Sequence, residues 1–303
     1  MHAFIPLPER REVLILTPSG ELDLHPETRP DPGPGQVLLR LLATGLDPHE
    51  LHPGPEPRRL GGSPVAQVVA VGDNVQGWGS LDRVLLTRLG DAPPAYDGLA
   101  TYMLASAPHL ERGSCIRLPV DFPAEEATLL PAAGRAGRVR HAAGSPRGGS
   151  LAVLGAAVLG LVPILLARHR RVDRIVAADA SPALRSKAEW SGATRLVRLP
   201  DDPFPDAVAR GAGPDGLDAA LVLLPDAALV HQAVEHLAPG GALILGAPTP
   251  RSFLLAFPAA EVQRRDLRIL GVSSIQESDL REAMQEVRQG VLNAETLITR
   301  RLA

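Results

Sequence analysis

The sequence is short of several residue types, and each shortage excludes a class of protein. Among 303 residues there is a single cysteine, Cys115, so no internal disulfide can form and a reducing compartment, the cytoplasm, is expected. A zinc site built from four cysteines is excluded for the same reason. The formal net charge is only −3, which does not favour nucleic acid as a partner.

Long apolar runs are also missing. The stretch 151–167 comes nearest to the about 18 residues of a membrane span, but glycines and a proline interrupt it. Glu9, Arg10 and Arg11 likewise break up any signal-peptide pattern near the start of the sequence. We therefore expect a protein without a membrane partner.

The distribution of apolar residues predicts two domains, in agreement with a length that allows about 150 residues for each. The first third holds short strand-like runs at 12–16, 36–42, 65–71 and 82–86, without long helices between them, which indicates a β-rich, barrel-like unit. We place this domain at 1–122 and the second at 123–272, with 273–303 packing back toward the first.

The second domain alternates apolar runs with helical patterns. This alternation predicts an α/β fold with a doubly wound parallel sheet. The expected strands are 151–154, 174–178, 195–198, 218–224, 242–245 and 268–272, and the expected helices are 158–170, 181–191, 225–238 and 277–290.

A glycine turn follows the first strand of this sheet, in the sequence Gly155-Ala156-Ala157-Val158-Leu159-Gly160. A turn of this kind at a helix start is typical of dinucleotide binding, because backbone N–H groups and the helix dipole hold the pyrophosphate. The expected contacts are Gly155, Ala157, Val158, Leu159 and Gly160. Ala157 stands where the usual motif has its middle glycine, and its methyl group hinders a close approach. The turn is therefore either a binding site or a turn kept for packing alone.

Asp179 ends the second strand of the sheet, nineteen residues after Gly160. A carboxylate there would accept the ribose hydroxyls of NAD(H) and repel the extra phosphate of NADP(H). We therefore expect NAD(H) in preference to NADP(H). The same aspartate could instead be a solvated residue before the helix that Ser181-Pro182 begins.

Two other polar groups have open interpretations. Asp47, His49 and His52 lie close together, and a helical turn after Pro48 would place both histidines on one face. They could perform acid–base chemistry, bind a metal, or form a solvated loop. A basic segment, with Arg135, Arg138 and Arg140, could bind an anionic group or be a solvated helix face.

Several motifs in one order resemble the medium-chain dehydrogenase/reductase superfamily, of the zinc alcohol dehydrogenase type. They are the segments 32–40, 43–52, 68–84 and 97–102, the turn 155–160, Asp179, and Gly192-Ala193. The resemblance implies a Rossmann doubly wound sheet plus an N-terminal GroES-like β-rich domain. It also implies a homodimer formed through the strand at 267–272, and further catalytic-domain elements beyond the point where this sequence stops.

The positions that carry the family's zinc chemistry differ here. Its first ligand position falls on Asp47, its Gly-His-Glu motif on Gly61-Gly62-Ser63, and its third ligand region near Pro131. A catalytic zinc needs about three protein ligands, so we expect a zinc-free, C-terminally shortened member. There is also no room for the structural zinc lobe between Val84 and Tyr102.

The resemblance thus implies a zinc-independent NAD(P)-dependent oxidoreductase that acts on a small carbonyl or an activated C=C substrate. His49 is the expected proton donor, with Asp47 and His52 beside it. Two alternatives stay open: the same fold catalysing a non-redox cyclisation, elimination or isomerisation, and a non-catalytic scaffold subunit.

Overall fold

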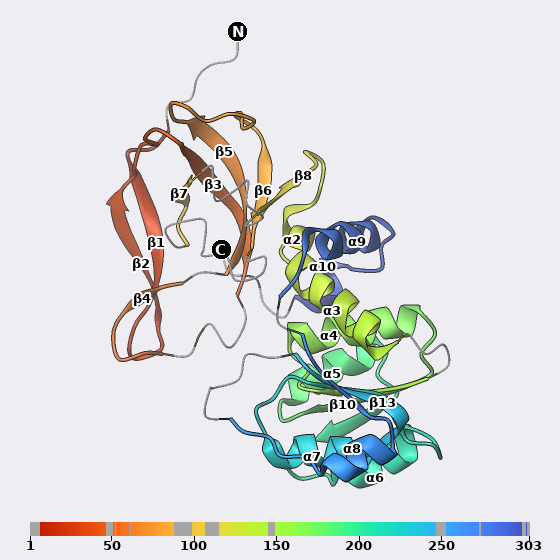
Figure 1. Cartoon of the computed structure of the whole chain (residues 1–303). Helices are drawn as coiled ribbons and strands as arrows, with labels where there is room; N and C mark the ends of the chain where they lie inside the picture. The colour runs from red at the N-terminus through yellow and green to blue at the C-terminus, as the bar shows by residue number, and fades with distance from the viewer. Residues whose placement is uncertain are drawn as a thin grey trace. The chain divides into compact units, whose positions relative to one another are not determined.

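The computed structural model describes residues 7–46, 51, 53–60, 62–87, 99–106, 115–144, 149–246, 253–272, 274–298 and 301. By their contacts the residues divide into two compact units, Met1–Pro131 and Ala132–Ala303 (Figure 1). The predicted boundary after residue 122 and the predicted packing of 273–303 remain predictions. In the described ranges, no helix has both the length and the apolar composition needed to cross a bilayer.

The first unit is β-rich. One sheet has three strands in the order β2-β1-β4, and a second has five in the order β7-β3-β5-β6-β8, with neighbouring strands antiparallel. The bounds are β1 Arg10–Leu16, β2 Leu22–Thr28, β3 Gln36–Gly45, β4 Arg58–Arg59, β5 Ser63–Val71, β6 Arg83–Leu86, β7 Tyr102–Ser106 and β8 Cys115–Leu118, followed by the short helix α2, Ala124–Ala127. The four strands predicted in this region are confirmed.

The core of this unit comes from inward-facing residues of both sheets. Val13 of β1 packs with Val37 and Leu39 of β3 and with Val68 of β5, and all four are fully buried. Alternate residues of a strand point to opposite faces, so an apolar alternation buries one face of each sheet. Strand β2 was not predicted, because its sequence Leu-Asp-Leu-His-Pro-Glu-Thr lies almost wholly exposed.

The second unit contains the Rossmann sheet. Six parallel strands have the order β11-β10-β9-β12-β13-β14, which confirms the predicted fold class. Their bounds are β9 Ser150–Leu154, β10 Arg174–Asp179, β11 Arg195–Arg198, β12 Leu217–Val222, β13 Leu237–Leu245 and β14 Arg268–Gly271. The helices are α3 Leu130–Ala143, α4 Val158–His169, α5 Pro182–Ser191, α6 Phe204–Gly211, α7 Ala227–Glu235, α8 Ala259–Arg264, α9 Glu277–Arg288 and α10 Ala294–Leu297.

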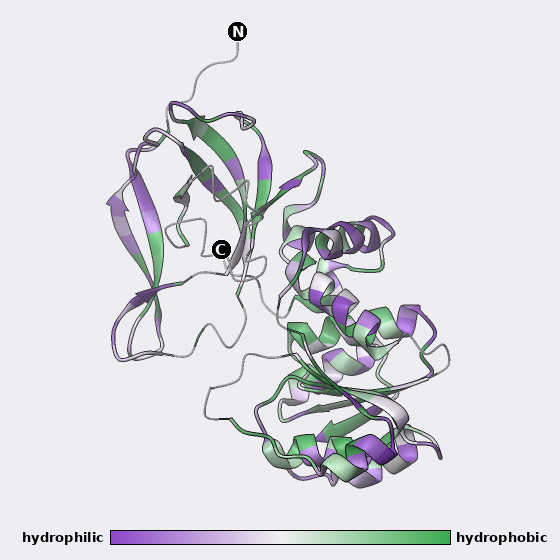
Figure 2. Ribbon diagram, in the orientation of Figure 1, coloured by the Kyte–Doolittle hydropathy of each residue, from purple (hydrophilic) through white to green (hydrophobic). Residues whose placement is uncertain are grey.

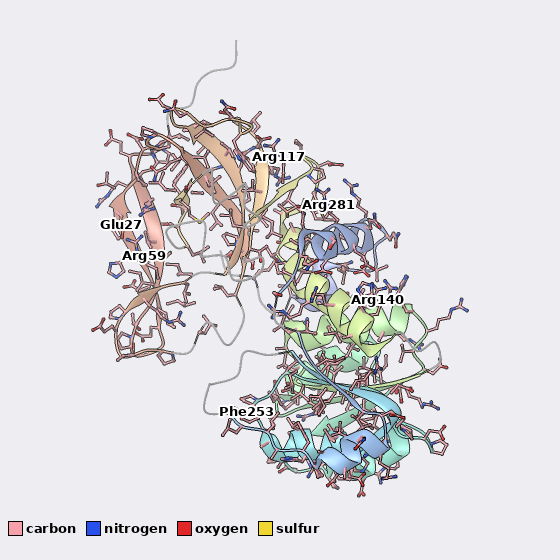
Figure 3. All side chains as sticks on the ribbon, in the orientation of Figure 1. Glu27, Arg59, Arg117, Arg140, Phe253 and Arg281 are labelled. Carbon is pink, nitrogen blue, oxygen red and sulfur yellow. The ribbon has the colours of Figure 1, made fainter. Side chains whose placement is uncertain are left out.

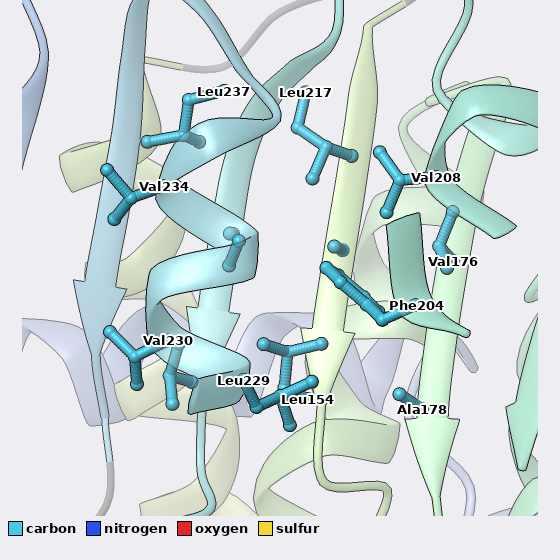
Figure 4. Close-up of a cluster of buried hydrophobic side chains, with 14 of the residues drawn as sticks. Leu154, Val176, Ala178, Phe204, Val208, Leu217, Leu229, Val230, Val234 and Leu237 are labelled. Carbon is cyan, nitrogen blue, oxygen red and sulfur yellow. The ribbon is translucent and has the colours of Figure 1, made fainter. Parts of the chain in front are cut away.

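Two helices bury one face of this sheet. Phe204 of α6 and Leu229 of α7 pack against Leu154 and Val176 in one cluster of buried side chains (Figure 4). Helix α7 ends at Glu235, earlier than the predicted end at 238, because β13 has already begun at Leu237, which pairs with Leu217.

The strand order fixes where a ligand can bind. β9 lies at the centre, and the chain continues first to β10 on one side and later to β12 on the other. The connections after β9 and β12 therefore leave the sheet in opposite directions. Such a switch point creates a crevice at the carboxyl ends of the strands, where open α/β sheets bind ligands. The glycine turn follows β9 at this point.

Candidate dinucleotide-binding site

Gly155 forms the bend directly after β9. Its φ is +108°, a conformation that L side chains rarely adopt. An added Cβ would also lie 3.1 Å from Cβ of Leu223 and 3.2 Å from Cγ of Leu224. Both the backbone angle and the crowding require glycine, as the motif predicts.

Gly160 has a different role, in the first turn of α4. A Cβ placed there would lie 2.0 Å from the carbonyl oxygen of Gly155 and 3.1 Å from Cγ1 of Val153. The missing side chain therefore lets the start of α4 pack directly against the end of β9. This close helix–strand packing is the role of the third glycine in dinucleotide-binding turns.

Ala157, at the middle glycine position, is unstrained. It is the residue immediately before α4, with φ −68° and ψ −176°, an extended conformation that any L-residue adopts. The alanine therefore keeps the turn conformation. Its methyl group matters only for how closely a ligand can approach.

The turn presents free donors. The N–H groups of Gly160 and Leu161 both donate to the carbonyl oxygen of Ala157, at 2.7 and 2.8 Å. Among the hydrogen bonds of the described residues, the N–H groups of Ala157, Val158 and Leu159 have no protein acceptor. Three donors at the positive end of a helix dipole suit a pyrophosphate, so these residues fit the phosphate part of a dinucleotide.

Asp179 lies against the same turn and is buried, with 8% of its surface exposed. Its Oδ2 accepts a hydrogen bond from the N–H of Ala156 at 2.7 Å, and its Oδ1 accepts one from the N–H of Ser181 at 2.8 Å. Each carboxylate oxygen keeps acceptor capacity for a further donor, such as a ribose hydroxyl. The structure thus brings Asp179 and the glycine turn together.

Two contributors to this site were not predicted. Ala156 acts through its backbone N–H, which no side-chain pattern reports. Arg185 of α5 donates from one nitrogen to the carbonyl oxygens of Asp179 and Ala180, at 2.8 Å each. The start of α5 after Ser181 was predicted, and Arg185 lies one turn into that helix.

The other predicted residues cannot be placed. Asp47, His49 and His52 lie outside the described residues, so the catalytic assignments stay predictions. Within the described ranges, no group of three or more His, Cys, Asp or Glu side chains could hold a metal ion.

The basic face of α3, which includes Arg138 and Arg140, contacts α9. It is neither the anion site nor the solvated face that the sequence suggested. Arg138 lies 3.7 Å from Asp279, and Arg140, labelled in Figure 3, pairs with Glu282. Helix α9 is predominantly hydrophilic (Figure 2). Arg138 and Arg140 therefore form ion pairs with acidic side chains of α9. The predictions of an anion site and of a solvated face are wrong for these two arginines.

A glycine of α3 and an arginine at the end of α4 make further contacts with α9. A Cβ at Gly134 of α3 would lie 3.3 Å from Cβ of Asp279, so the small residue allows α9 to approach closely. Toward the C-terminal end of α9, Glu286 pairs at 3.0 Å with Arg170, which directly follows α4. Burial raises the pKa of the Glu286 carboxyl, although Arg170 opposes this shift.

Comparisons with known proteins find similarity to dehydrogenases. Residues 158–289 match the family model of zinc-binding dehydrogenases. The chain is 26% identical over 253 residues to the NADP-dependent isopropanol dehydrogenase of Thermoanaerobacter brockii, covering 74% of this chain and 72% of that protein. It is 26% identical over 235 residues to sorbitol dehydrogenase of Bos taurus, covering 67% of this chain and 64% of that protein, which is less than two thirds of its length.

A solved structure supports the fold. The putative zinc-binding dehydrogenase of Sinorhizobium meliloti 1021, bound to NADP, superposes with a TM-score of 0.76 at 21% sequence identity. The match covers 94% of this chain and 90% of the other.

Proposed function

We propose that this chain, which belongs to the medium-chain dehydrogenase/reductase superfamily, is an oxidoreductase that transfers hydride between a nicotinamide dinucleotide and a small carbonyl or activated C=C substrate. One observation carries the proposal: the free N–H groups of residues 157–159 and the carboxylate of Asp179 meet at the switch point of the sheet. The turn would hold the pyrophosphate, and Asp179 the adenosine ribose. The bound dinucleotide supplies or accepts the hydride.

The proposed preference is for NAD(H) over NADP(H). The buried carboxylate of Asp179 would lie beside the ribose, where it would repel a 2′-phosphate. The nearby Arg185 already donates to two backbone carbonyl oxygens. Its guanidinium is therefore less available to bind that phosphate.

We further propose that the reaction needs no zinc. Of the positions that resemble the family's ligands, Ser63 is a β5 residue paired with Gly45, and Pro131 lies in α3 and has no donor atom in its side chain. These residues do not fit a catalytic zinc, which takes its ligands from cysteine, histidine and carboxylate side chains. Hydride transfer without a Lewis acid requires another group to stabilise the developing oxyanion. We propose that His49, with Asp47 and His52 beside it, donates a proton to that oxyanion.

The test is a titration of the purified protein with NADH and with NADPH, followed by nicotinamide fluorescence and calorimetry. We expect micromolar binding of NADH, weaker binding of NADPH, and loss of NADH affinity in Asp179→Ala. Asp218→Ala is the matched control, because Asp218 accepts the N–H of Ser150 at the same 2.7 Å but at the opposite end of β9. Failure of both nucleotides to bind at millimolar concentration would overturn the proposal.

Zinc independence has its own test. The metal content of the purified protein and its turnover after dialysis against a chelator should show no zinc requirement. Stoichiometric zinc whose removal abolishes turnover would contradict this part of the proposal.

We also propose a homodimer, which would form through the exposed edge strand β14. β14 is one of the two edge strands of the six-stranded sheet, and its Ile269 is 38% exposed. An apolar edge with unpaired N–H and C=O groups tends to pair with another strand. Pairing with β14 of a second copy would cover it. Light scattering after size exclusion should give twice the chain mass, and a monomer mass would reject the pairing.

A further inference from the structure

Asp179 bridges two turns through its carboxylate. The turn after β9 contributes the N–H of Ala156, and the turn after β10 contributes the N–H of Ser181. Ala156 is fully buried, so its N–H cannot reach water instead. A buried N–H without an acceptor costs about 1–3 kcal/mol. The backbone at Ala156 is therefore tied to the position of this carboxylate.

The three free donors of the phosphate site begin at the next residue. The N–H of Ala157 follows Ala156 directly, and those of Val158 and Leu159 follow in turn. On the other side of Ala156, Gly155 holds a φ of +108°. A rotation of the peptide that carries the Ala156 N–H would change the neighbouring backbone angles and so redirect these donors.

The carboxylate is itself fixed from the second turn. Arg185 donates to the carbonyl oxygens of Asp179 and Ala180, and Ser181 Oγ accepts from the N–H of Leu184 at 3.4 Å. The backbone around Asp179 is thus held by α5, whatever binds at the ribose position. This arrangement lets Asp179 act as a rigid support for the neighbouring turn.

We infer that Asp179 is a positioning residue for the pyrophosphate site as well as a ribose acceptor: through the N–H of Ala156 it orients the donors of residues 157–159. This inference rests on the proposed function. It predicts that loss of the carboxylate weakens binding of pyrophosphate itself, a ligand that has no ribose. A carboxylate that served the ribose alone would leave pyrophosphate binding unchanged.

The experiment uses the full chain and three variants: Asp179→Asn, Asp179→Glu and the control Asp218→Asn. Calorimetry with sodium pyrophosphate and with NADH measures the two parts of the site separately. Asp179→Asn replaces one acceptor oxygen by an NH₂ group, so we expect an about tenfold loss of pyrophosphate affinity, equivalent to one charge-assisted hydrogen bond. Asp218→Asn should bind pyrophosphate as the unaltered chain does.

A second readout does not depend on ligand. The amide resonances of Ala156 and Ser181, followed by ¹⁵N–¹H correlation spectra, should move in Asp179→Asn and stay in place in Asp218→Asn. If Asp179→Asn does not fold, Asp179→Glu takes its place, because it keeps the charge while its extra methylene carries the carboxylate past the Ala156 amide.

The outcomes separate the two proposals. Unchanged pyrophosphate affinity with reduced NADH affinity would make Asp179 a ribose ligand only and overturn the inference. If the unaltered chain binds neither probe, the proposed function fails. An unmoved Ala156 resonance in Asp179→Asn would then overturn the positioning role independently.

Discussion

Substitution of alanine for Gly160 should destabilise the second unit, whereas the same substitution at Gly137 should stabilise it. Both glycines lie in helices, Gly160 in α4 and Gly137 in α3. At Gly160 the new Cβ would be 2.0 Å from the carbonyl oxygen of Gly155, far inside the about 3.5 Å of van der Waals contact. At Gly137 the nearest atom is Oε2 of Glu282, at 3.8 Å.

The magnitudes follow from two opposing effects. In a helix interior alanine is favoured over glycine by about 1 kcal/mol. This gain applies at Gly137, and at most the same gain applies at Gly160 in the first turn of α4. Overpacking costs about 1–3 kcal/mol, and the upper end applies at Gly160 because the obstructing atom is backbone that cannot rotate away. We therefore expect Gly160→Ala to lose about 2 kcal/mol and Gly137→Ala to gain up to about 1 kcal/mol.

Thermal unfolding followed by circular dichroism measures the stability changes of both variants. For a domain of this size each kcal/mol shifts Tm by about 2–4 °C, so Gly160→Ala should fall by about 4–8 °C and Gly137→Ala should rise by about 2–4 °C. Because α4 can relieve the clash only by moving from the turn, Gly160→Ala should also lose NADH affinity. A Gly160→Ala variant as stable as the unaltered chain would refute the claim that α4 and β9 meet this closely.

The remaining predictions concern a buried carboxyl, the single lysine and the turn. Burial raises the pKa of the Glu286 carboxyl above 4.5 in the folded state, so the folded state binds more protons at this site than the unfolded state. As the pH rises from 4.5 through that raised pKa, the free energy of unfolding of the chain should fall relative to that of Glu286→Gln. Urea unfolding at several pH values measures this difference. A difference that moved the other way would contradict the assigned burial. Lys187 donates to the carbonyl oxygen of Thr296 at 3.2 Å, so Lys187→Met should increase amide hydrogen exchange in α10 while α7 serves as an internal reference; equal exchange in both would reject the contact. Ala157→Gly should tighten NADH binding in the fluorescence titration, because it removes the methyl group from the phosphate approach, and weaker binding would show that the methyl is not an obstacle.

The parallel sheet could be predicted because each of its strands is a local apolar run. The turn was predictable for a similar reason, since Gly155, Gly160 and Asp179 are each required by a backbone angle, a close approach or a strand end. The bond from Ala156 could not be predicted, because every residue except proline carries the same N–H. Strand β2 was missed because its alternation of Leu22 and Leu24 with polar residues is short and reaches Pro26, a residue that sequence patterns rarely place inside a strand.

The basic face of α3 shows a second limit. Read alone, Arg138 and Arg140 look like a free cationic surface. Their acidic partners in α9 are remote in sequence, and Glu282 lies 142 positions after Arg140. Charge patterns along one helix cannot identify a partner at that distance.

The same separation has a consequence for synthesis on the ribosome. Helix α3 leaves the exit tunnel long before Asp279 and Glu282, the partners of its arginines, are translated. During that interval the nascent chain carries the arginines of α3 without their counter-charges. Domains generally fold as units during synthesis, and contacts between distant residues close late. The second unit therefore reaches its final stability only when α9 has been synthesised and its acidic side chains pair with α3.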